Sequence, residues 1–173
     1  MLRGINVSSQ KKIKMADFKI NLQELNFTDV QTYIQSGNAV FKYKKIASKA
    51  LENKIAKKIF EEYGFEVSVI VKSPDELKDV IKNNPFIKDK ELNRLYVTFL
   101  SDEPTSDNLE KLKGIDYRPE EYVLKGKMIY GYAPHGYGKA KMSNNFFENK
   151  LKVAATTRNW KTVNKLAEMV ADG

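Results

Sequence analysis

The sequence predicts an α+β fold in which the order strand–helix–strand–strand–helix–strand occurs twice. Three observations predict it: short segments rich in β-branched and aromatic residues, longer segments with apolar residues three and four apart, and a polar, proline-broken stretch near the middle of the chain. This order is the split βαβ arrangement of ferredoxin-like folds. We therefore expect two ferredoxin-like (βαββαβ) halves packed as one compact protein, with an extra C-terminal helix.

The composition is that of a globular protein. The chain has 173 residues, of which 42% are hydrophobic and 30% charged, and this is ordinary globular usage. It has no cysteine, which excludes disulfides, a thiolate nucleophile and cysteine metal sites. No apolar run approaches the roughly 20 residues that cross a bilayer, and the first residues lack the pattern of an export leader. We expect a cytoplasmic protein without a membrane partner.

The first predicted lobe covers residues 1–72. Its strands are the segments LRGINV, VQTYIQS, AVFKY and FEVSVIV. Only Gly37 and Asn38 separate the second strand from the third, so we expect a two-residue hairpin turn of a primed type. One helix begins at Met15, and Ser48 is expected to cap a second helix.

Residues 73–93 are predicted to be a helix and the connection between the lobes. Gly64 ends the preceding helix, because glycine readily adopts the left-handed conformation at a helix C-terminus. Ser73 and Glu76 have the spacing of a capping box, with Pro74 at the first helical position. A helix is therefore expected to begin at this point of the chain.

The second predicted lobe covers residues 94–173. RLYVTFL, EYVLKG, KMIYGY and KVAAT predict its strands, and short helices are expected around Leu109 and Phe146. A glycine-rich loop, APHGYGKA, precedes the second of these helices. The closing helix is expected to begin at about Arg158, with Trp160 first in its buried stripe.

Three motifs, taken together, resemble an uncharacterised bacterial family. They are LRGINV at residues 2–7, TYIQSGN at residues 32–38 and TTRNW at residues 156–160. In this order they are similar to domain of unknown function 1697, over essentially the whole chain. The resemblance implies an α+β protein of two ferredoxin-like halves, and it implies no reaction. Relatives carry residues before the R-G-I-N segment that complete the first strand, so this strand is expected to be short here. They also often carry glycines where Ser8 and Ser9 stand.

The chain is basic, with a formal net charge of +8. A basic surface attracts nucleic acid, anionic lipid or phosphorylated ligands. Nearly all of the excess is lysine on predicted helix faces near glutamate, so we favour an incidental basic surface over nucleic-acid binding. Arginine is rarer, and its planar fork suits bidentate recognition of an oxyanion. The arginines are Arg3, Arg94, Arg118 and Arg158.

Polar residues of the three motifs are candidates for an anion site. Alternation places Arg3 with Ile5 and Val7 on one face of the first strand, where a charge needs a carboxylate or a bound oxyanion as partner. The TTRN residues would open the last helix, whose N–H groups favour anions; the simpler alternative is that Thr157 or Asn159 caps that helix. The predicted ligand-binding residues are Arg3, Asn6, Ser36, Asn38, Thr157, Arg158 and Asn159.

Other patterns give weaker indications. The serines and lysines after the first strand are interpreted as a solvated loop in preference to an anion cradle. A turn explains Ser36-Gly37-Asn38 without a nucleophile. His135 is a lone histidine, so no metal site and no cofactor are predicted. SGNAVFKY faintly resembles an RNA-recognition strand, but its stacking positions carry Asn38 and Val40, which have no ring.

We expect the protein to bind a phosphate-bearing or other anionic small ligand. In this hypothesis Arg3 and Arg158 line one pocket, within about 10 Å of each other, as a site of ligand size requires. The first alternative is binding of RNA or single-stranded nucleic acid on an open sheet face. The second is a protein-interaction module. The sequence leaves the oligomeric state, any catalytic residue and enzyme activity itself open.

Overall fold

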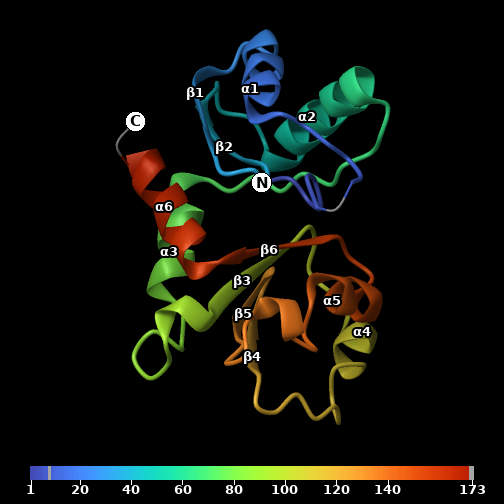
Figure 1. The fold of residues 1–173 in the computed structure, drawn as a ribbon, viewed down its shortest axis with the longest axis vertical. Helices are drawn as coiled ribbons and strands as arrows, with labels where there is room; N and C mark the ends of the chain where they lie inside the picture. The colour runs from blue at the N-terminus through green and yellow to red at the C-terminus, as the bar shows by residue number, and fades with distance from the viewer. Residues whose placement is uncertain (8, 172–173) are drawn as a thin grey trace. The chain divides into compact units, whose positions relative to one another are not determined.

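The structure is a computed structural model that describes residues 1–7 and 9–171. In this described part it combines two antiparallel sheets with six α-helices, which confirms the predicted mixture of helix and sheet. The chain divides into two units (Figure 1). Unit 1 consists of Met1–Leu77 and the chain from Leu166 onward, and unit 2 is Lys78–Lys165. The lobe boundaries 1–72, 73–93 and 94–173 stay a prediction.

Unit 1 contains a β-hairpin and two helices that follow one another closely in the chain (Figure 1). The two strands pair in antiparallel orientation, so the predicted hairpin is confirmed. These elements are α1 (Met15–Glu24), β1 (Thr28–Tyr33), β2 (Asn38–Lys42) and α2 (Ser48–Tyr63).

Residues 2–7 do not form the predicted first strand. Leu2 makes a single antiparallel bridge with Val69, and the segment FEVSVIV likewise contributes only this bridge to a sheet. The chain leaves the extended conformation at Gly4, with φ +64°, and again at Asn6, with φ +55°. Two left-handed residues within three positions end a ladder, and side-chain alternation ends with it.

The burial of this segment follows the broken backbone. Leu2 and Ile5 are both 1% exposed, whereas Val7 is 64% exposed. The prediction that Ile5 and Val7 share one face with Arg3 is therefore wrong. A period of two requires continuous extended backbone, which the left-handed residues interrupt.

The hairpin loop is longer than predicted. Tyr33 pairs with Asn38 across the strands, so the loop is the four residues 34–37, and the expected two-residue turn is wrong. Ile34 and Gly37 adopt positive φ values of 51° and 80°. Asn38 belongs to β2 and is fully buried; its Nδ2 donates to the Tyr33 carbonyl at 3.1 Å and to Ser36 Oγ at 2.9 Å. These bonds join the loop to the strands on both sides.

The N-terminal segment packs directly on this hairpin loop. The Leu2 N–H donates to the Gly37 carbonyl at 2.8 Å, and Asn6 Nδ2 donates to the Gln35 carbonyl at 2.8 Å. A Cβ atom at Gly37 would stand 2.7 Å from Ile5 Cδ1 and 2.8 Å from Leu2 Cβ. Position 37 therefore has no room for a side chain, quite apart from its backbone conformation.

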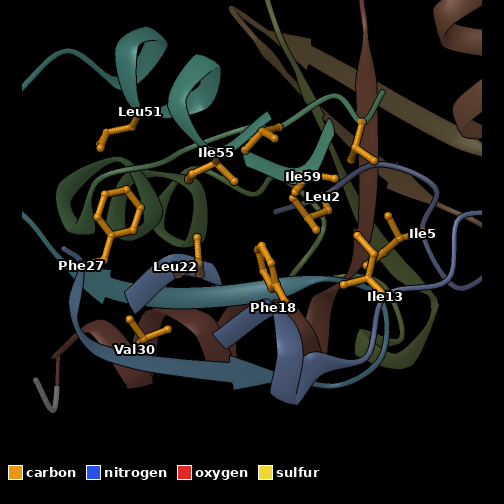
Figure 2. Packing of buried hydrophobic residues seen from close by; sticks show 12 residues of the cluster. Leu2, Ile5, Ile13, Phe18, Leu22, Phe27, Val30, Leu51, Ile55 and Ile59 are labelled. Carbon is orange, nitrogen blue, oxygen red and sulfur yellow. The ribbon is translucent and has the colours of Figure 1, made fainter. Parts of the chain in front are cut away.

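One apolar core holds unit 1 together (Figure 2). Side chains of α1, α2 and the hairpin contribute to it, and Leu2, Ile5 and Ile13 gather at one end of the cluster. Figure 2 draws the buried members as sticks. They are Leu2, Ile5, Ile13, Phe18, Leu22, Phe27, Val30, Leu51, Ile55, Ile59, Val67 and Val69.

The helix boundaries test the predicted caps. Gly64 adopts φ +71° and its N–H bonds the Phe60 carbonyl, which confirms it as the end of α2. Ser48 is the first residue of α2 rather than its cap, since Ala47 holds the N-cap position. The capping box before α3 (Pro74–Lys82) is confirmed: the Ser73 N–H donates to Glu76 Oε2 at 2.8 Å, and the Glu76 N–H donates to Ser73 Oγ at 3.2 Å.

Unit 2 is built on one four-stranded sheet, and its strands lie in the order β4-β5-β3-β6 (Figure 1). Every neighbouring pair is antiparallel. The elements of this half are β3 (Leu95–Leu100), α4 (Ser106–Glu110), β4 (Glu121–Lys125), β5 (Met128–Tyr132), α5 (Asn144–Leu151) and β6 (Ala155–Asn159). The first three predicted strands and the short helices are confirmed, whereas the last strand was predicted at residues 152–156 and begins three residues later.

The last helix, α6, spans Trp160–Ala171. Trp160 and Val163 are buried as predicted. Both α3 and α6 begin in one unit and end in the other, because the units meet in the chain at residues 77/78 and 165/166. Across the described residues, every helix is too short or too polar to span a bilayer.

Gly37→Ala is expected to destabilise the protein strongly. The new Cβ meets both left-handed strain and the atoms of Leu2 and Ile5, so we expect a loss of about 2–4 kcal/mol in the free energy of unfolding. The matched control is Gly64→Ala, which has a similar φ but nothing within 4 Å of the new Cβ, and it should cost only about 1 kcal/mol. Urea unfolding measures both, and equal losses would contradict the close packing at Gly37.

Acidification is expected to weaken the start of α3. Burial opposes ionisation of Glu76, but hydrogen bonds from Ser73 and from the Lys72 ammonium outweigh it and lower the pKa of this carboxyl. The stabilisation is therefore complete above the ordinary value of 4.5 and is lost as the pH falls through the lower folded value. The stability advantage of the wild type over Glu76→Gln should shrink below that pH in chemical unfolding. A constant difference would show that the carboxylate charge contributes nothing.

Candidate functional site

The seven predicted ligand-binding residues divide between the two units. Arg3, Asn6, Ser36 and Asn38 belong to unit 1, whereas Thr157, Arg158 and Asn159 belong to unit 2. A single pocket that holds both sets stays a prediction. Each set can be described within its own unit, and Ser8, beside the first set, lies outside the described residues.

Asn6 uses its side chain to hold the loop before α1. Its Oδ1 accepts the Ile13 N–H at 2.9 Å, and its Nδ2 donates to the carbonyls of Ile13 and Gln35, both at 2.8 Å. Both donors and one acceptor position of the amide are thus bonded to backbone. Arg3 is half-buried, and its backbone N–H donates to the Ser68 carbonyl at 3.0 Å.

The TTRN residues form strand β6, not the start of the last helix. Arg158 lies opposite Val97 in the ladder with β3 and is only 7% exposed. Its Nη1 donates to Thr156 Oγ1 at 2.8 Å and to the Thr157 carbonyl at 2.9 Å. Burial lowers the pKa of Arg158 to about 10, so the guanidinium is still charged at neutral pH.

Thr157 and Asn159 have different structural roles. The hydroxyl of Thr157 lies 2.8 Å from that of Thr98 and donates to Asn144 Oδ1 at 3.1 Å, so Thr157 links β6 to β3 and α5. Asn159 Oδ1 accepts the Thr162 N–H at 2.8 Å, which is the bond of an N-cap residue. Of the two predicted caps of the last helix, Asn159 is confirmed and Thr157 is wrong.

The structure adds an apolar cavity in unit 1 that none of the seven residues lines. Its volume is about 470 Å³, within the range of small-molecule sites. The walls come from α1, α2, the end of β2 with the chain that follows it, residues 69–73, the start of α3 and the end of α6. We call this the unit 1 cavity.

Large apolar side chains form the walls of the unit 1 cavity. Phe41 of β2 stacks on Phe27 with ring centroids 4.3 Å apart, and Tyr43 meets Phe27 edge-on at 4.7 Å. The packing of these rings fixes the wall on the hairpin side. The remaining apolar walls include Phe18, Leu22, Leu51, Ile55, Val69, Leu77, Leu166, Met169 and Val170.

Lysines make up most of the charged part of the lining. Lys42 forms an ion pair with Asp29 at 2.9 Å, and Lys72 forms one with Glu76 at 2.9 Å. Lys44 and Lys45 are exposed, and neither has a carboxylate partner within the described residues. The cavity thus combines an apolar interior with an uncompensated positive charge.

Sequence reasoning missed this cavity for a physical reason. Its walls are ordinary core residues in helices and strands, and apolar periodicity does not distinguish a packed position from one that faces a void. One signal was present: the run Lys42-Tyr43-Lys44-Lys45 begins at the last residue of β2 and places several cations beside the aromatic side chains of the hairpin.

Comparison with known proteins confirms the family that the motifs indicate, although the third motif, at residues 156–160, lies outside the matched range. A family model described as "Protein of unknown function (DUF1697)" matches residues 1–130. The chain belongs to this family.

Among solved structures, the conserved bacterial protein SP0830 from Streptococcus pneumoniae is similar, with a TM-score of 0.71 and 24% identity over 98% of this chain and 96% of that one. This likeness shows a shared fold. No curated protein matches the chain.

Asn6→Gly is expected to destabilise unit 1 through loss of the side-chain hydrogen bonds alone. Glycine accepts the φ of +55° but leaves the buried Ile13 N–H without its acceptor, so we expect a loss of about 2–3 kcal/mol in the free energy of unfolding. The matched control is Asn26→Gly, at an exposed asparagine with φ +63°, which should change stability by less than about 0.5 kcal/mol. Calorimetric unfolding distinguishes the two, and equal effects would contradict a side-chain role for Asn6.

Proposed function

We propose that the protein binds an anionic small molecule with an apolar body, and that the unit 1 cavity is the binding site. The observation that carries the proposal is the pairing of an apolar cavity of about 470 Å³ with a lysine-rich lining. An apolar pocket with a few polar groups is the usual form of a small-molecule site. The tail of the ligand would lie against the side chains of α1 and α2, and its acidic head would lie beside Lys44 and Lys45.

The two parts of the cavity contribute differently to binding. Each methylene buried against the walls contributes about 0.8 kcal/mol, which is about a fourfold gain in affinity. An exposed lysine contributes at most about 1 kcal/mol to an ion pair, because water and salt screen the charge. The tail therefore supplies most of the affinity, while the lysines select for an acidic head and orient it at the mouth.

The alternatives have less support. Nucleic-acid binding on the hairpin requires exposed rings for stacking, but Phe41 is half-buried and stacks on the buried ring of Phe27. No feature favours a protein-interaction module over the cavity. The binding roles of Arg3 and Arg158, a cytoplasmic location and the absence of a membrane partner stay predictions.

We also propose that each unit is a ferredoxin-like half. In unit 2, the order β4-β5-β3-β6 with antiparallel neighbours is the arrangement that a βαββαβ chain of this class adopts. In unit 1, the antiparallel bridge between Leu2 and Val69 joins the positions of the first and fourth strands. Both observations support the same underlying topology.

A series of straight-chain carboxylates tests the proposed function. Affinity by titration calorimetry should rise about fourfold per added methylene from hexanoate through octanoate to decanoate, and decanoate should raise the melting temperature. Decanol, which has the same tail length without a charge, should bind more weakly than decanoate. An affinity that does not change with chain length would overturn the proposal.

Paired lysine variants test the role of the lining. Lys44→Gln with Lys45→Gln should weaken decanoate binding by about threefold to tenfold and leave decanol binding unchanged. The control is Lys12→Gln with Lys14→Gln, which makes the same change in net charge at exposed positions outside the cavity. If both double variants weaken decanoate binding equally, general charge attraction and not the cavity accounts for the effect.

A further inference from the structure

A second concavity lies entirely within unit 2, and it shares no residue with the unit 1 cavity. Its volume is about 500 Å³. The lining consists of Arg94 from just before β3, Glu120 from just before β4, residues 133–136 and Lys139. We call it the loop pocket, because most of its lining belongs to the glycine-rich loop after β5.

Hydrogen bonds fasten this loop to the sheet. The Ala133 N–H donates to the Arg94 carbonyl at 3.0 Å, and the Tyr137 N–H donates to the Tyr96 hydroxyl at 3.3 Å. The Asn144 N–H donates to the Tyr137 hydroxyl at 2.6 Å, which ties the same loop to the start of α5. The lining of the loop pocket is therefore held by bonds at both ends of the loop.

Arg94 has spare hydrogen-bonding capacity at the loop pocket. Its Nε is buried and has no hydrogen-bond partner within the described residues; the nearest carboxylate, that of Glu91, is 4.0 Å away. A buried donor without a partner costs free energy, which a ligand acceptor would recover. Because a Cβ at Gly136 would stand 3.2 Å from Arg94 Nη1, the guanidinium lies directly against the loop.

The charges around the loop pocket favour an anion. Lys139 adds a second cation and His135 a ring N–H donor, and both are exposed. Glu120 is the one acidic residue of the lining, and its two oxygens accept the N–H groups of Lys141 at 2.7 Å and Met142 at 3.0 Å. That carboxylate is thus occupied by the backbone, while the two cations face the concavity.

We propose that the loop pocket binds the phosphate group of a small molecule. The guanidinium of Arg94 offers a planar pair of N–H donors that fits two oxygens of one phosphate. A tetrahedral phosphate presents further oxygens on its other sides, which Lys139 and His135 can reach from the loop. A planar carboxylate would use the guanidinium fork and leave these other donors without a role. The proposal is independent of ligand binding in the unit 1 cavity.

Phosphate titration followed by nuclear magnetic resonance tests the proposal on the intact chain. Methyl phosphate and inorganic phosphate should shift the Arg94 Nε–H signal with saturation, because this N–H gains its first acceptor. Acetate at equal ionic strength should bind at least about tenfold more weakly, since it has only two oxygens in one plane. A Nε–H signal that does not move, or an equal response to acetate, would overturn the proposal.

Variants of the lining complete the test. Arg94→Lys keeps the charge but loses the fork, and it should weaken methyl phosphate binding at least about tenfold. The matched control is Arg118→Lys, at an exposed arginine of the same unit that pairs with Asp116 at 2.8 Å, and binding should not change. If Arg94→Lys fails to fold, Lys139→Ala at an exposed position should still weaken binding about threefold. Unchanged binding in Lys139→Ala, or equal loss in Arg118→Lys, would contradict the assignment.

Discussion

The contact between the N-terminal segment and the hairpin loop is the constraint on which unit 1 depends. The Leu2 N–H bonds the Gly37 carbonyl, and only the absence of a side chain at position 37 lets Leu2 and Ile5 pack so close to the loop. Leu2 is also a wall of the unit 1 cavity. The motifs at residues 2–7 and 32–38 therefore contact each other here. The position of Leu2 in the cavity wall depends on this contact. In this chain the two motifs therefore have a packing role that requires no chemistry.

Local signals in the sequence predicted most of the elements, and long-range pairing decided the rest. The Ser73–Glu76 capping box and the end of α2 at Gly64 follow from neighbouring residues, and both are confirmed. The prediction of a first strand was wrong because an alternating pattern of residues does not reveal the left-handed backbone at Asn6. The TTRN segment was predicted to begin the last helix. In the structure Arg158 lies opposite Val97 in the ladder between β6 and β3, so pairing with β3 determines the conformation of the segment.

The candidate sites show what polar motifs do and do not reveal. Asn6 and Asn159 were predicted to bind a ligand because each is an amide near an arginine in the sequence. In the structure both side chains form hydrogen bonds with backbone groups. Arg94 is one of the four scarce arginines, and its buried Nε lacks a hydrogen-bond partner among the described residues. The sequence could not connect Arg94 with His135, about forty positions away, since only the pairing of β3 with β5 brings the glycine-rich loop back to the start of β3.

Unit 1 is discontinuous in the chain, and this has a consequence for its biosynthesis. Its first part ends at Leu77, and the remainder begins at Leu166, after the whole of unit 2. Leu166, Met169 and Val170 form one wall of the unit 1 cavity and are synthesised after every residue of unit 2. Domains commonly fold as they emerge during translation, but this wall is still missing when unit 2 is complete. A nascent chain can therefore form the hairpin and its helices early, while the cavity closes only after residues 166–170 have been added.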